Sequence, residues 1–174
     1  MAGEWAVLAL LVEEPVHGFA VARAMAPDGD VGRIWSVRRP LVYRAIDTLT
    51  EMGLVRSRAT EPSRSGPRRT VIEATPAGRR ALKAWLAEPV AHVRDARSLL
   101  MLKLLFLDHR GSDPRPLLEA QRARFAGLAE RLAAAAERAE GFDRALALWR
   151  LESTTGALRF VETMLAEPSR ARRT

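Results

Sequence analysis

Residues 36–55 constrain the fold of this chain more than any other stretch. Apolar side chains recur there at helical spacing, which predicts a helix over about residues 38–52 with one buried side. Pro40 suits the first turn, where its missing N–H leaves little unmatched, and Gly53 can end the helix with a positive φ. The predicted inward stripe is Val42, Ile46, Leu49 and Met52. The outer face, formed by Arg39, Pro40, Tyr43, Arg44 and Asp47, is then basic and aromatic. It is typical of a helix in a DNA groove, although an ordinary amphipathic surface helix would show the same period.

Two shorter helices are expected before this one. Apolar residues from Trp5 to Val12 follow the i, i+3, i+4, i+7 spacing, so residues 4–13 are predicted to form a helix that ends before Pro15. A second helix is expected to end near Ala26. Its inward side is predicted to carry Phe19, Ala22 and Met25.

A change to period two follows the central helix. Residues 55–60 and 68–74 are predicted strands, joined by a loop rich in turn-forming residues. They form a hairpin with Arg64, Arg68 and Arg69 at or near its tip. Thr75-Pro76 is an N-cap followed by proline at the first position of the next helix. Three helices followed by a hairpin indicate a winged helix-turn-helix, whose third helix enters the major groove.

The positive charge is concentrated in the same region. The chain of 174 residues has a formal net charge of +7. Residues 33–80 carry eleven arginines and four acids, whereas residues 1–32 carry one arginine and five acids. A local basic excess of this kind is the electrostatic signature of a nucleic-acid surface. A general preference for arginine over lysine explains the scarcity of lysine but not this placement.

Several classes of protein are not supported by the sequence. There is no cysteine, and the three histidines do not stand at metal-ligand spacing. Phosphate-binding loops and nucleophile motifs are absent, so we expect no enzyme activity, no metal and no cofactor. No secretory signal is apparent, and the longest apolar run, residues 99–107, is too short to span a bilayer. We therefore expect a cytoplasmic protein without a membrane partner.

The second half of the chain is expected to be helical. Helices are predicted over residues 95–108, about 114–140 and 142–166. The middle helix can be written as heptads, with Leu118, Phe125, Leu132 and Ala139 at one core position and Gln121, Leu128 and Ala135 at the other. The last helix shows two apolar stripes: Leu146, Trp149, Ser153, Gly156 and Phe160 on one, and Leu148, Leu151, Thr155, Leu158 and Leu165 on the other.

This much two-sided apolar surface predicts self-association around a twofold axis. An antiparallel hairpin that folds back on the N-terminal domain of a monomer is the alternative. The expected fold class is mainly α with a small β-hairpin wing. A winged helix-turn-helix domain covers residues 1–90, and an α-helical, coiled-coil-like dimerisation domain covers residues 91–174.

Three stretches of the N-terminal half carry a family resemblance. They are Pro-Val-His-Gly-Phe-Ala-Val at residues 15–21, Val-Tyr-Arg-Ala-Ile-Asp-Thr-Leu-Thr-Glu-Met-Gly-Leu-Val at 42–55, and Gly-Pro-Arg-Arg-Thr-Val-Ile-Glu-Ala-Thr-Pro-Ala-Gly-Arg at 66–79. Together with Ala-Trp-Leu at 84–86, they resemble the PadR family of bacterial transcriptional regulators over nearly all of residues 4–90. The Tyr-Arg helix motif combined with Thr-Pro-x-Gly-Arg is fairly specific, although either motif alone suits other winged-helix regulators.

The resemblance implies a homodimeric, ligand-responsive repressor in which Tyr43 and Arg44 face DNA and residues 66–69 form the basic wing. The sequence departs from the family pattern at two places. Phe19 stands where tyrosine is frequent, and Arg38-Arg39-Pro40 stands where small polar residues are common. By the same analogy, an effector that is planar or apolar would bind near the dimer interface. The aromatic residues Trp5, Trp149 and Phe160 are candidate contacts, because flat rings can stack on such a ligand. Ordinary core or interface packing would also account for these rings.

The sequence therefore predicts a sequence-specific, homodimeric repressor of double-stranded DNA that a small-molecule effector releases. The expected DNA-binding residues are Arg39, Pro40, Tyr43, Arg44, Asp47, Arg64, Arg68 and Arg69. The competing hypothesis is a winged-helix protein–protein interaction module that does not bind DNA.

Overall fold

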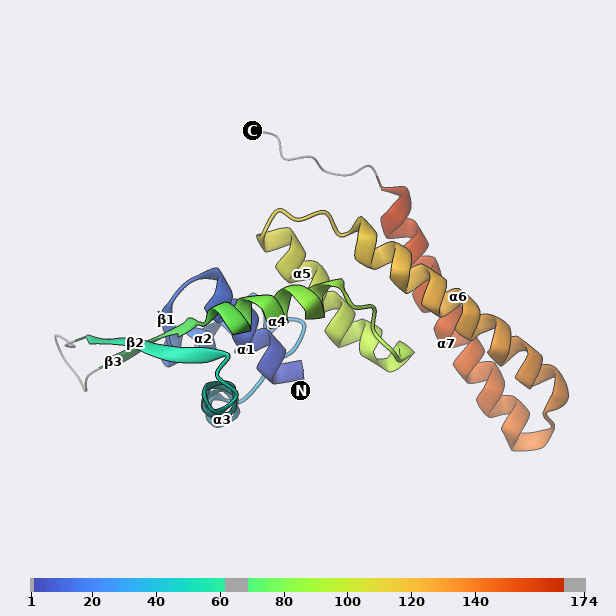
Figure 1. Ribbon diagram of the computed structural model, residues 1–174. Coiled ribbons are helices and arrows are strands. Elements are labelled where there is room, and N and C mark those ends of the chain that lie inside the picture. The colour runs from blue at the N-terminus through green and yellow to red at the C-terminus, as the bar shows by residue number, and fades with distance from the viewer. Residues whose placement is uncertain (1, 62–68, 168–174) are drawn as a thin grey trace. The chain divides into compact units, whose positions relative to one another are not determined.

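The computed structural model describes residues 2–61 and 69–167 and divides into two compact units (Figure 1). Unit 1 contains residues 1–86 and 101–106, and unit 2 contains residues 87–100 and 107–174. Units defined by packing within one chain are not folding domains, so the expected boundary after residue 90 stays a prediction. The fold class is confirmed: the structure is mostly helical, with one small antiparallel sheet.

Helix α1 (Ala2–Glu13) is the centre of unit 1. Its residues Ala6, Val7, Leu8, Ala9 and Leu11 are all fully buried, as expected for a helix that is apolar nearly all round. It packs against α2 (Gly18–Ala24), α3 (Arg39–Glu51) and the sheet. Helix α4 (Pro76–Ala87) follows the sheet.

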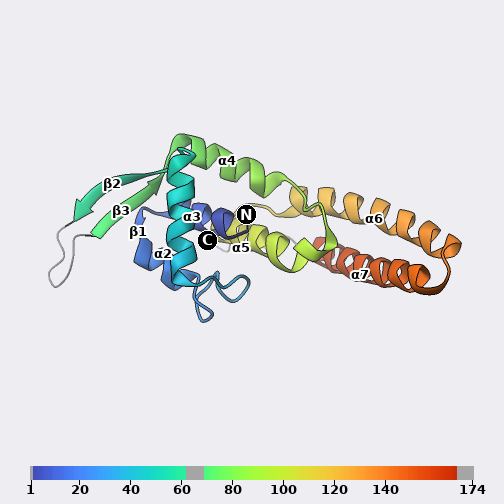
Figure 2. The same cartoon turned by 90° about the horizontal axis from the view of Figure 1, so that it is seen from below.

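The sheet has three strands in the order β1-β3-β2, all antiparallel. Strands β2 (Val55–Glu61) and β3 (Arg69–Ala74) are the predicted hairpin, with an irregular register between Ser57 and Ala59. Figure 2 shows the pair extending beyond α3. Strand β1 (Val16–His17) was not predicted, because two residues are too few to display a period of two.

A cluster of hydrogen bonds joins the end of α3, the sheet and α4. The Thr75 hydroxyl donates to the carbonyl of Gly53 at 2.7 Å and accepts from the N–H of Gly78 at 3.1 Å. The predicted N-cap is thus confirmed. Gly78 lies so close to Leu54 that a Cβ atom there would stand 2.1 Å from the Leu54 carbonyl oxygen. The Thr-Pro-x-Gly-Arg motif is therefore a structural joint as well as a family marker.

Two further side chains tie neighbouring helices into unit 1. The Arg79 guanidinium donates to the carbonyl of Val12 at 3.0 Å, near the end of α1. The buried Lys103 ammonium donates to the carbonyl of Trp85, and it lies 4.5 Å from the centre of the Trp85 ring. Cations near the last carbonyls of a helix stabilise it, because these groups carry partial negative charge. Residues 101–106 are thereby attached to α4.

Two of the predicted inward residues are exposed. Met52 is 64% exposed, because α3 ends at Glu51 and Met52 follows its last turn. Phe19 is 53% exposed, because it lies outside the buried side of α2, which carries Gly18, Val21 and the correctly predicted Ala22. Both residues lie at a helix end, where a stripe extrapolated from the helix interior no longer matches the backbone.

Unit 2 is built on an antiparallel pair, α6 (Arg115–Arg138) and α7 (Gly141–Ala166), which lie side by side in both views (Figures 1 and 2). The predicted start at residue 95 is wrong, because Val93–Asp95 is a 3₁₀ turn and Ala96–Leu100 a π-helical segment before α5 (Met101–His109). The predicted N-cap of the next helix, Asp113, is wrong by one residue, because Pro114 is the N-cap of α6. The Asp113 carboxylate still accepts from the N–H of Arg115 at 3.0 Å. No helix of the described residues is long and apolar enough to cross a membrane.

The interior of unit 2 uses only part of the predicted apolar pattern. The predicted core residues Leu118, Gln121 and Phe125 are buried on α6. The Gln121 amide exchanges two hydrogen bonds with the backbone of Val90, at 2.7 and 3.1 Å, which satisfies this buried polar side chain.

The buried side of α7 was not predicted. Its buried residues are Ala147, Thr154 and Val161, one heptad apart, and they belong to neither predicted stripe. Small residues there allow α6 to approach closely. On the first predicted stripe, Trp149 is 72% exposed and Phe160 is 38% exposed. The strongest apolar pattern of α7 is thus not the side that contacts α6.

Candidate nucleic-acid interface

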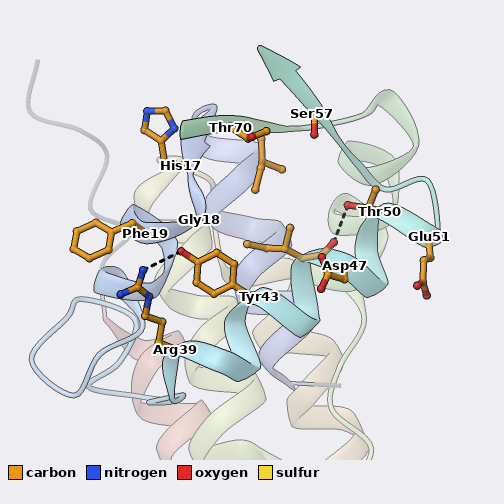
Figure 3. Close-up of a pocket in the computed structure, with 12 residues that line it drawn as sticks. His17, Gly18, Phe19, Arg39, Tyr43, Asp47, Thr50, Glu51, Ser57 and Thr70 are labelled. Carbon is orange, nitrogen blue, oxygen red and sulfur yellow. Dashed lines mark hydrogen bonds between the residues drawn. The ribbon is translucent and has the colours of Figure 1, made fainter. Parts of the chain in front are cut away.

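A hollow surface forms where the start of α2, the outer face of α3 and the two long strands meet (Figure 3). Residues His17, Gly18 and Phe19 border it at the junction of β1 and α2, and Ser57, Thr70 and Ile72 border it at the sheet. Helix α3 contributes Arg39, Tyr43, Ile46, Asp47, Thr50 and Glu51. The surface is therefore shared by the three elements that define a winged helix-turn-helix.

Arg39 is held between two aromatic rings on this surface. Its guanidinium carbon lies 5.3 Å from the centre of the Phe19 ring and 5.6 Å from that of Tyr43. The Arg39 Nη2 also donates to the Tyr43 hydroxyl at 3.4 Å (Figure 3). A guanidinium near ring faces gains cation–π attraction, and its planar fork is less free to rotate.

Tyr43 is itself positioned by the start of α2. A Cβ atom at Gly18 would stand 2.9 Å from the Cε1 of Tyr43 and 3.4 Å from the Cδ1 of Ile46. Glycine at residue 18 therefore lets the tyrosine ring pack directly on the α2 backbone. This contact was not predicted from the sequence, where Gly18 stands only as part of a short connection.

The arginines of β2, unlike Arg39, lie close to a carboxylate. Arg56 forms an ion pair with Glu73 on β3, with 2.7 Å between Nη2 and Oε1. Arg58 lies 3.8 Å from the other oxygen of the same carboxylate. Glu73 thus neutralises part of the charge on β2, an effect that the strand register explains but that the charge count alone does not show.

The predicted DNA-binding residues of α3 all lie on its exposed side. Arg39, Pro40, Tyr43, Arg44 and Asp47 are exposed, in contrast to the buried residues Val42, Ala45, Ile46 and Leu49. Arg69 begins β3, whereas Arg64 and Arg68 lie outside the described residues. Phe19, Gly18, Ser57 and Thr70 share the surface and were not predicted as part of it.

The predicted effector residues fall in different surroundings. Trp5 stacks on Trp85 in unit 1, with ring centres 5.2 Å apart and planes 7° apart. In unit 2, Trp149 lines a separate hollow, and Phe160 is not one of the residues that line it. The other lining residues are His92, Val93, Arg94, Arg97, Leu128, Leu132, Arg150, Ser153 and Thr154. In the described ranges, no group of three or more His, Asp or Glu side chains could hold a metal ion.

The fold and this surface define a winged helix-turn-helix, a class of DNA-binding protein. Residues 7–84 match the model of the transcriptional regulator PadR-like family. Over this segment the chain is similar to the PadR-like transcriptional regulators. The resemblance inferred from the sequence motifs is thereby confirmed.

One further similarity covers part of the chain. The chain is 29% identical over 97 residues to the probable transcriptional regulator Rv1176c of Mycobacterium tuberculosis. The alignment covers 56% of this chain and half the length of that relative.

Solved structures of similar fold include Bacillus subtilis PadR in complex with operator DNA and in complex with p-coumaric acid. The first has a TM-score of 0.48 at 21% identity, covering 94% of this chain and 97% of the other. The second has a TM-score of 0.46 at 19% identity, covering 95% and 98%.

Proposed function

We propose that the protein is a homodimeric repressor that binds a specific sequence of duplex DNA and is released by a small-molecule effector. The observation that carries the DNA-binding part is the exposed face of α3. It presents Arg39, Tyr43 and Arg44 beside the start of α2 and the wing strands. Duplex DNA as the ligand agrees with the expectation of a cytoplasmic protein.

The side chains of α3 suit both kinds of DNA contact. Arginine can bond the O6 and N7 atoms of guanine together, and a carboxylate such as Asp47 can accept from the amino group of cytosine. Wing arginines would bind phosphate, which adds affinity but little base discrimination. We therefore assign base reading to α3, and phosphate binding to Arg64, Arg68 and Arg69.

Dimer formation is proposed from the uncovered stripe of α7. Phe142 and Trp149 are 80% and 72% exposed, and residues 142, 149, 156 and 160 fall on one side of a helix with 100° per residue. Burying an aromatic side chain stabilises by about 1.5–3 kcal/mol, so a second copy of the chain is the simplest partner for this stripe. A twofold dimer also supplies two recognition helices for two half-sites.

The effector site is proposed at the hollow of unit 2. Trp149, Leu128 and Leu132 offer an aromatic and aliphatic wall to a flat ligand. Arg94, Arg97 and Arg150 line the same hollow and would favour a ligand with an acidic group. Of the three aromatic residues predicted from the sequence, only Trp149 is retained in this proposal. An effector bound there would lower DNA affinity if it binds the DNA-free dimer more tightly.

Removing two wing arginines should change the salt dependence of DNA binding. Each phosphate contact contributes about 0.9 to the slope of log K against log salt concentration. The double variant Arg68→Ala/Arg69→Ala is expected to flatten that slope by up to about two units. Fluorescence anisotropy with a labelled duplex gives the binding constant of the variant and of the unmodified protein from low to moderate salt.

The control removes the same charge from another surface. Arg122 and Arg124 are exposed on α6, so Arg122→Ala/Arg124→Ala should leave the slope close to that of the unmodified protein. If the unmodified protein binds no duplex at low salt, the competing hypothesis of a protein–protein interaction module replaces this one.

A further inference from the structure

We propose that Phe19 determines sequence specificity without touching DNA, by fixing the guanidinium of Arg39 in a plane from which it reads a guanine. This inference rests on the proposed function, because it concerns how the DNA-binding surface selects bases. It adds a positioning residue on α2 to the base-reading residues of α3.

The contacts of Phe19 indicate what the side chain does. A phenylalanine that is 53% exposed contributes little to the interior of unit 1, whose buried α2 residues are Gly18, Val21 and Ala22. Its ring instead stands 5.3 Å from the Arg39 guanidinium carbon, and Tyr43 stands 5.6 Å from the same atom. Figure 3 shows the three side chains gathered at one end of the hollow.

Aromatic contacts restrain an arginine without neutralising it. Among the described residues Arg39 forms no ion pair, whereas Arg56 is paired with Glu73 at 2.7 Å. An arginine that is paired with a carboxylate already uses some of its N–H donors in that contact, and the carboxylate neutralises its charge. Arg39 gives one long hydrogen bond to Tyr43, so most of its five N–H donors and its full charge remain available.

A restrained guanidinium suits a base edge better than a phosphate. All its donors lie in the plane of the fork, and guanine offers two acceptors, O6 and N7, at fixed positions in the major groove. A phosphate oxygen accepts from many directions and gains less from a fixed plane. The position of Arg39 in the first turn of α3 also matches the part of a recognition helix that contacts base edges.

The test compares variants on a panel of duplexes. The bound consensus is first selected with the unmodified protein, and the affinity is then measured for every single-base change in a half-site. We expect one position where guanine is preferred over each other base by about 5- to 150-fold, equivalent to about 1–3 kcal/mol. Arg39→Ala should abolish the preference at that position.

Phe19→Leu removes the ring and keeps an apolar side chain of similar size. It should reduce the same preference to less than about threefold, whereas Phe19→Tyr, which keeps a ring, should retain it. In the Arg39→Ala background, Phe19→Leu should have no further effect on that position. Arg122→Ala, on the exposed side of α6, serves as the control and should leave the preference for guanine at that position unchanged.

Each other result contradicts the inference in a recognisable way. An unchanged preference in Phe19→Leu would show that Arg39 is positioned without the ring. If Arg39→Ala weakens all duplexes equally and lowers the salt slope by about one unit, Arg39 binds phosphate instead. If the unmodified protein binds no duplex, the proposed function fails together with this inference. Thermal unfolding of each variant confirms that the fold is intact.

Discussion

Replacing Gly78 with alanine is expected to destabilise the protein by about 3 kcal/mol or more, at the upper end of the effect of overpacking. The added Cβ would stand 2.1 Å from the Leu54 carbonyl oxygen and 3.2 Å from the Cδ1 of Leu8. The first neighbour is backbone, so it cannot turn away as a flexible side chain can. Relief of the clash would also disturb the Thr75 bonds to Gly53 and to the N–H of Gly78. Denaturant unfolding, followed by circular dichroism, measures the change in free energy.

Gly127 offers a control within another helix. A Cβ there would meet only the Arg131 side chain, at 3.5 Å. Gly127→Ala should therefore be neutral or stabilising by about 0.5–1 kcal/mol, because alanine loses less backbone entropy in a helix than glycine does. Equal stability of the Gly78→Ala variant and the unmodified protein would contradict the close packing of α4 on residue 54.

Placing two glutamates on the exposed stripe of α7 is expected to convert a dimer into a monomer. Phe142 and Trp149 are the most exposed large apolar residues of α7, and neither belongs to its buried side. The double variant Phe142→Glu/Trp149→Glu should keep the α6–α7 pair folded while it adds unpaired charge to the dimer contact. Loss of bivalent binding should reduce affinity for a full operator by about 10²–10⁴-fold.

Light scattering at micromolar concentration gives the oligomeric state of this variant. The variant Ser112→Glu/Ala123→Glu adds the same charge at two other exposed residues and should remain a dimer. A monomeric unmodified protein would contradict the proposed role of α7. In that case the predicted alternative, in which the C-terminal helices fold back within one chain, would account for the apolar stripes.

The interior of the helices was the most predictable part of this fold. Val42, Ile46 and Leu49 are spaced three or four residues apart, which places them on one face of a helix, and all three are buried. Met52 and Phe19 also fit the helical spacing of apolar residues, yet both are exposed because they lie at helix ends. Strand β1 is held by pairing with β3, a tertiary contact that leaves no local pattern in two residues.

The helix α7 shows why apolar pattern alone does not assign partners. Trp149 and Phe160 stand out in the sequence, but the α6 contact uses the small side of the helix, at Ala147 and Thr154. A periodic stripe indicates that a surface will be buried without indicating what covers it. Only the structure shows which side of α7 is buried within the chain.

The candidate site was predictable only in part. Outward residues of α3 follow directly from its period, so Arg39, Tyr43 and Arg44 could be identified in advance. Their relation to α2 could not, because it depends on how two helices cross. In the sequence, Phe19 and Arg38-Arg39-Pro40 are two unrelated departures from the family pattern. In the structure, Phe19 and Arg39 are in contact, 5.3 Å from ring centre to guanidinium carbon.

Selection of bound sites from random duplex DNA tests the central claim most directly, because it reports sequence preference and symmetry together. A homodimer that reads DNA through two copies of α3 should enrich an inverted repeat. Its half-sites should be centred about 10–10.5 base pairs apart or at a multiple of that spacing, with a guanine in each half-site. No enriched sequence, or a single asymmetric site bound by one copy of the chain, would contradict the account.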